Sequence, residues 1–219
     1  MLTFETVRNN EAIKIYIERA NESLRALGYT EHSFPHVLKV ADTASYILRT
    51  MGYSEREAEL AKIAGYLHDI GNLVNRHEHA QSGAVMAFRI LDNLGADAAD
   101  IATIVTAIGN HDEGTAEAVN PVAAALILAD KTDVRRSRVR YPDITTFDIH
   151  DRVNYAVTSS KTEIDSDKKA ISLTLEVDTE MCAVMDYFEI FLNRMILCRK
   201  AAAKLGLVFQ LNINGQRLL

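Results

Sequence analysis

The amino-acid sequence predicts a mainly α-helical protein, a helical bundle followed by a small C-terminal α+β appendage. Apolar residues recur at helical spacing through the first three-quarters of the chain, and glycines stand where several of these stripes stop. An alternating apolar–polar pattern appears only near the C-terminus. The first pattern predicts packed helices around a core, and the second predicts a few strands beside them.

The helices of the bundle begin and end at recognisable signals. Ser54 and Glu57 form a capping box, because each side chain can bond the backbone of the other residue. Gly28 and Gly95 follow two apolar stripes as C-terminal stops. The ranges expected to be helical in this part are 9–27, 34–52, 54–70, 79–94, 97–108 and 120–130. The last of these is so apolar that we expect it to be buried.

The pattern of apolar and polar residues changes after Tyr141-Pro142. We expect two more helices and two strands, and the strands should share one sheet because they bracket a helix. In chain order, the expected elements are a helix over 147–158, a strand over 170–177, a helix over 180–204 and a strand over 207–213. This predicts a helical domain over 1–160 and a strand–helix–strand appendage over 161–219.

Composition narrows the function classes. The net charge is −6, which argues against an extended nucleic-acid partner or a membrane surface, since both require a positive excess. The N-terminus lacks the pattern of a signal peptide, and no apolar run is long enough to span a bilayer. Cys182 and Cys198 are expected on one helix, too far apart for a disulfide. These features favour a cytoplasmic protein with free thiols.

A set of histidines and aspartates falls at or near the ends of the expected helices. Their imidazole and carboxylate groups are ligands that divalent metals accept, and several helices of a bundle can direct them to one point. Asp130, directly after a very apolar helix, would be costly to bury without a cation. The candidate metal ligands are His36, His68, Asp69, His79, His111 and Asp130.

The order of these residues resembles the signature of the HD superfamily of metal-dependent phosphohydrolases. The similarity covers about residues 30–140 and rests on His36, His68, Asp69 and Asp130 in this order. The local sequence agrees, with His36 before the Val37–Ala41 run, the His68-Asp69 doublet before Ile70-Gly71, and Lys131 after Asp130. The resemblance implies an HD-type helical bundle.

In superfamily members with two metals, a histidine after the doublet and another before the last aspartate bind a second ion, and His79 and His111 match those positions. The resemblance therefore implies a binuclear site in which Asp69 bridges the ions and is catalytic. The metal is expected to be Fe, Mn, Mg, Co, Ni or Zn. Asp112 or His77 could carry a proton to the leaving group.

Many members of the superfamily have a lysine where this chain has Asn72, so a lysine role in phosphate binding is not transferred to this position. Positive charge for a phosphate is expected instead from the stretch after the last aspartate, above all from Lys131, Arg135 and Arg136, and less from Arg138. The features of the cyclic-dinucleotide branch are missing around His111. Their absence argues against hydrolysis of cyclic-di-GMP.

The leading hypothesis is a hydrolase of a phosphate ester or anhydride in a small nucleotide or phosphorylated metabolite. Two alternatives stay open: a regulatory module that binds a nucleotide or metal without catalysis, and a diiron HD-like oxygenase. His32 and His77 are expected to form surface or supporting hydrogen bonds, and His150 a structural one. The apolar face around Phe191 and Met195 indicates core packing or a homodimer contact.

Overall fold

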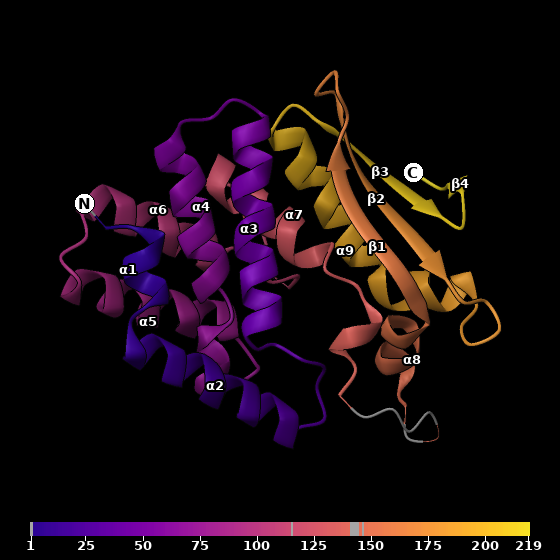
Figure 1. The fold of residues 1–219 in the computed structure, drawn as a ribbon, viewed down its shortest axis with the longest axis horizontal. Helices are drawn as coiled ribbons and strands as arrows, with labels where there is room; N and C mark the ends of the chain where they lie inside the picture. Colours follow the sequence, from indigo (N-terminus) through magenta and orange to yellow (C-terminus); the bar gives the residue numbers. More distant parts are fainter. Residues whose placement is uncertain (1, 115, 141–144, 146) are drawn as a thin grey trace.

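The computed structural model describes residues 2–114, 116–140, 145 and 147–219. Figure 1 shows a helical part, drawn from indigo to magenta, beside a smaller part in which a sheet covers a long helix. The prediction of a mainly helical fold with a small α+β appendage is confirmed. In the described part of the chain, no helix is long and apolar enough to cross a membrane.

Seven α-helices and a short 3-10 helix, η1, precede the basic stretch in the described part of the chain. They are α1 (Phe4–Arg8), α2 (Glu11–Ala26), α3 (Phe34–Thr50), α4 (Glu55–Leu67), η1 (Ile70–Leu73), α5 (His79–Asn93), α6 (Ala98–Gly109) and α7 (Pro121–Lys131). The Ser54–Glu57 capping box at the start of α4 is present as predicted.

Helix α7 is the centre of the fold. Every residue from Val122 to Ala129 is buried, because α3, α4 and α6 of the bundle and the later helix α9 (Val184–Lys204) all pack against it. The α3–α4 contact is close enough that a Cβ on Gly65 would lie 2.7 Å from the Ala41 Cα. Helices held this tightly can fix the side chains at their ends.

The C-terminal part contains a four-stranded sheet in the order β1-β2-β3-β4. Its strands are β1 (Val157–Ile164), β2 (Ala170–Val177), β3 (Val208–Ile213) and β4 (Gln216–Arg217). Strands β1 and β2 are antiparallel, β2 and β3 are parallel, and α9 makes the crossover between the parallel pair. The two predicted strands therefore do share a sheet.

The predicted bounds of two helices in this part are corrected. The helix expected over 147–158 is shorter, because α8 (Ile149–Ala156) gives way to β1 at Val157. The long helix begins at Val184 and not near residue 180. Cys182 therefore lies outside α9, although Cys182 and Cys198 are both buried free cysteines.

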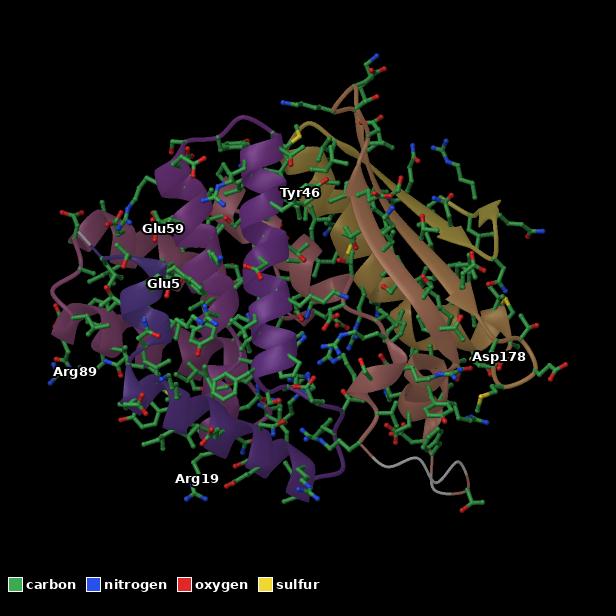
Figure 2. The ribbon with its side chains drawn as sticks, in the orientation of Figure 1. Glu5, Arg19, Tyr46, Glu59, Arg89 and Asp178 are labelled. Atoms are coloured by element: carbon green, nitrogen blue, oxygen red, sulfur yellow. The ribbon has the colours of Figure 1, made fainter. Side chains whose placement is uncertain are left out.

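Strand β1 runs across the expected boundary at residues 160 and 161. The division into two domains stays a prediction. The two parts are joined directly: the Tyr46 hydroxyl on α3 lies 3.5 Å from the Ile164 backbone nitrogen on β1, and Figure 2 shows Tyr46 on the side of α3 that faces the sheet. Helix α9 also packs on α7, so the C-terminal part contacts the bundle at a second place.

Candidate metal centre

The structure brings together the six residues that the sequence singled out as metal ligands. Each comes from a different helix or helix end, apart from the adjacent pair His68 and Asp69. His36 lies in the first turn of α3, the doublet follows α4, and His79 is the first residue of α5. The remaining two are His111, which follows α6, and Asp130, in the last turn of α7.

His36, His68 and Asp130 form the inner half of the cluster. The Nε2 atoms of the two histidines lie 3.3 Å apart, and Asp130 Oδ1 lies 3.5 Å from His36 Nε2 and 3.7 Å from His68 Nε2. Asp69 Oδ2 approaches the same two nitrogens at 3.5 and 3.2 Å. A tetrahedron with ion–ligand bonds of about 2.1 Å has edges of about 3.4 Å, so these spacings fit a metal ion.

His79 and His111, with Asp112 beside them, form the outer half. The Nε2 atoms of these histidines are also 3.3 Å apart. Asp69 Oδ1 lies 3.4 Å from His79 Nε2, and Asp112 Oδ1 lies 3.9 Å from the same nitrogen. Asp69 therefore directs one carboxylate oxygen toward each half.

The second ring nitrogen of every cluster histidine has a fixed partner. Nδ1 of His68, His79 and His111 donates to a backbone carbonyl three residues earlier, at 2.8, 3.1 and 2.6 Å. His36 Nδ1 donates instead to Asp133 Oδ2 at 2.8 Å. These bonds keep the proton on Nδ1 and turn the Nε2 lone pair toward the cluster, as in histidine ligands of metals.

The electrostatics of the inner half favour a positive charge. Burial lowers the pKa of His68, but the carboxylates of Asp69 and Asp130 overcome this and raise that pKa to about 10. Burial raises the pKa of Asp69, yet His68 and His36 hold it well below its usual range. Asp69 Oδ2 is buried and has no hydrogen-bond partner among the described residues. An oxygen of this kind is stabilised by a positive ion.

Burial favours the neutral form of the histidines in the outer half. Burial, followed by repulsion from His68, lowers the pKa of His111 to about 3, and burial lowers the pKa of His79. Neutral imidazoles with free Nε2 lone pairs are ready to bind a metal without losing a proton. The donor set of both halves therefore fits divalent ions.

Gly71 and Asn72 hold the doublet in place. A Cβ on Gly71 would lie 2.0 Å from the His79 carbonyl oxygen, so the close approach of η1 to α5 requires glycine. Asn72 Nδ2 donates to the backbone and side-chain oxygens of Asp69 at 2.9 and 3.1 Å. Asn72, at a position where many HD-superfamily members have lysine, thus supports Asp69.

Asp133 is a residue that the sequence reasoning missed. Its side chain is fully buried and, besides His36, receives contacts from Lys39 Nζ at 3.0 Å and Arg135 Nε at 2.9 Å. A carboxylate behind a ligand histidine increases the basicity of the imidazole and fixes its orientation. Its position three residues after Asp130 does not by itself distinguish it from an exposed aspartate.

The residues expected to bind phosphate are spread over two environments. Lys131 is buried with its Nζ 2.8 Å from Asp130 Oδ2, and it lines a cavity beside the cluster. Arg135 pairs with Asp133, and Arg136 stacks 4.6 Å over the Tyr155 ring. Neither Arg135 nor Arg136 lines the cavity.

The cavity has a volume of about 140 Å³ and opens beside Asp69, His79 and Asp130. Residues from before α3, from the stretch after α7 and from α8 and α9 complete its walls. His32 lines it, with Nδ1 donating to the Thr30 carbonyl at 2.7 Å, and burial together with Arg138 holds the pKa of His32 well below its usual value. His150 also lines the cavity, although we expected it to be structural.

Residues 34–135 match the family model of the HD domain. This stretch of the chain is therefore similar to the HD domain. All six cluster residues fall within the matched range, whereas α8, α9 and the sheet lie beyond it.

Three known proteins show how far the similarity extends. The uncharacterized protein MJ1020 of Methanocaldococcus jannaschii is 26% identical over 203 residues, which cover 82% of this chain and 77% of that protein. Ribonuclease Y of Enterococcus faecalis is 27% identical over 123 residues, which cover 54% of this chain and 21% of the ribonuclease. A crystal structure of a predicted HD superfamily hydrolase from an uncultured Thermotogales bacterium is 24% identical, covers 62% of this chain and 75% of that one, and has a TM-score of 0.45.

Proposed function

We propose that this protein is a binuclear metal-dependent phosphohydrolase that cleaves a phosphate ester or anhydride in a small nucleotide or phosphorylated metabolite. The observation that carries the proposal is the position of Asp69, with one oxygen toward the inner histidines and the other toward the outer ones. A carboxylate in this position is suited to bridge two ions a few ångströms apart, as two-metal hydrolytic sites require.

His36, His68, Asp69 and Asp130 would hold one ion, and His79, His111 and Asp69 the other. Divalent ions supply Lewis acidity toward phosphoryl oxygens and activate a water for attack. Lys131, fixed by Asp130, contributes positive charge at the wall of the cavity. Asp112 is half-buried at the edge of the outer half, and although burial raises its pKa, Lys131 and His79 hold that pKa below the usual range. An ionised carboxylate at this point can accept a proton during the reaction.

Metal analysis and a phosphate-release assay on the purified protein test the proposal together. We expect about two transition metals per chain and release of phosphate from at least one small phosphoester. The absence of bound metal, and of activity after addition of Mn or Fe, would favour a regulatory module. Oxygen uptake without phosphate release would favour an oxygenase.

An RNA substrate belongs in the same panel because of the similarity to Ribonuclease Y. The net charge of −6 and the cavity walls contributed by α8 and α9 favour a small substrate. Cleavage of RNA in preference to every small phosphoester would contradict this part of the proposal.

A further inference from the structure

The cavity beside the metal cluster is lined by both cations and carboxylates. Four basic side chains line it: Arg76, Lys131, Arg138 and Arg194. Helix α8 contributes Asp151 to the same lining, and its N-terminal capping residue contributes Asp148. Together with the metal-cluster residues, these basic and acidic side chains determine which ligands the cavity can bind.

Two of the four cations already have carboxylate partners. Lys131 Nζ contacts Asp130 Oδ2 at 2.8 Å and Glu113 Oε1 at 3.6 Å. Arg194 Nε lies 2.5 Å from the same Glu113 oxygen, and its guanidinium stacks over the Phe191 ring. Much of the charge of these two residues is therefore neutralised within the protein.

Arg76 and Arg138 differ from that pair, because neither has a carboxylate at ion-pair distance among the residues that the structure describes. Arg138 is only 5% exposed and donates to two backbone carbonyls, those of Glu31 and Asp133. Arg76 contacts the Tyr29 ring and the Asn72 side-chain oxygen. A buried guanidinium without a counter-ion is costly, and an anion bound in the cavity would offset the cost.

Asp148 and Asp151 have the opposite preference. Asp148 Oδ1 accepts the backbone N–H of Asp151 at 2.8 Å, which holds the first turn of α8, and both residues line the cavity. Carboxylates accept hydrogen bonds, so they favour a neutral hydroxyl-rich group and repel a second phosphate. The cavity is therefore complementary to a molecule that carries both an anion and hydroxyl groups.

We propose that the substrate is a phosphorylated polyol such as a sugar phosphate. Arg76 and Arg138 bind its phosphate beside the cluster, and Asp148 and Asp151 accept hydrogen bonds from its hydroxyl groups. This inference rests on the proposed hydrolase function and specifies the substrate class. It also assigns part of the selectivity to α8, which lies outside the HD domain match at residues 34–135.

The phosphate end is tested by calorimetric titration of the metal-containing protein with inorganic phosphate. We expect Arg76→Met to weaken phosphate binding at least 10-fold, since a charge-assisted hydrogen bond is lost. Arg138→Lys, which keeps the charge and removes the planar fork, should weaken it by a smaller factor. The matched control Arg89→Met alters an exposed arginine on α5 that Figure 2 shows pointing away from the bundle, and it should not change binding.

Arg136→Met distinguishes this assignment from the one that the sequence suggested. A loss of phosphate binding in Arg136→Met, with unchanged binding in Arg76→Met, would overturn the proposed subsite. Circular dichroism of each variant establishes that the fold is intact, and Arg76→Met alone carries the test if the buried Arg138 variant unfolds.

The hydroxyl end is tested by comparing a sugar phosphate with phenyl phosphate, which has no hydroxyl groups. We expect Asp151→Asn to raise KM for the sugar phosphate about 10-fold and to leave KM for phenyl phosphate unchanged. Asp167→Asn, in the exposed turn between β1 and β2, is the control. An equal effect on both substrates, or none on either, would overturn the substrate class while hydrolysis of phenyl phosphate still upheld the proposed function. No metal-dependent hydrolysis of either compound, or of any other phosphoester, would instead defeat the function itself.

Discussion

The inner and outer halves of the histidine cluster use the same kinds of ligand in different surroundings. In the inner half, the side chains of His36 and His68 are fully buried, two carboxylates approach both Nε2 atoms, and Asp133 supports one histidine. In the outer half, Nδ1 of each histidine donates to a backbone carbonyl and not to a carboxylate. The side chain of Asp112 there is 33% exposed. The inner half therefore has the greater negative charge and should bind an ion more tightly.

The largest effect should come from the residue that the two halves share. Asp69→Ala removes the oxygens that face both histidine pairs, so we expect loss of most metal from both halves and a fall in turnover of at least about 1000-fold. Elemental analysis and the phosphate-release assay measure the two effects. Asp92→Ala, on the exposed face of α5, is the control. Full activity in Asp69→Ala would exclude the mechanism.

A smaller effect should follow from damage to one half. His111→Ala is expected to remove about one ion of two and to lower activity about 100-fold, because the inner half keeps all its ligands. The metal content of His36→Ala, which damages the inner half, provides the comparison. An unchanged metal content in His111→Ala would leave the cluster with a single ion.

Asp133→Asn tests the inner half separately, because Asp133 accepts a hydrogen bond from His36 in that half. Asparagine can still accept from His36 Nδ1, but the negative charge is lost, and the affinity of the inner ion should fall about 10- to 100-fold. Competition titration with a chelator reports the affinities of the two ions separately. Equal weakening of both ions would indicate a general structural defect in place of a positioning role.

The smallest effect is expected at Asp112. Asp112→Asn removes a partly exposed charge 3.9 Å from His79 Nε2, so the outer ion should bind only several-fold more weakly. If Asp112 accepts a proton in the reaction, kcat should fall more than the metal affinity does. A parallel loss of the two would assign Asp112 to metal binding alone.

The sequence predicted the helical bundle and the convergence of the six cluster residues, because each sits beside a clear helix start or stop. Asp133 was missed since nothing in a Lys-Thr-Asp stretch distinguishes a buried carboxylate from an exposed one. Arg76 lies in a polar turn between η1 and α5, where only the fold shows that it faces the cavity.

The strands that escaped prediction are those with weak patterns. Strand β1 is an edge strand in which Val157 is the only fully buried residue, so it lacks the alternation that identified β2. Strand β4 has only two residues. Periodicity reveals elements that bury a face, and neither of these strands buries one.

The cluster joins parts of the chain that are far apart in sequence. The inner ligands His36 and Asp130 are separated by 94 positions, and the residues between them include the whole of α4, α5 and α6. An ion bound here would act as a reversible cross-link across a long loop, and such links restrict the unfolded chain the most. Chelation should therefore shorten the lifetime of the folded state and expose the bundle to proteases, even where the average structure is unchanged.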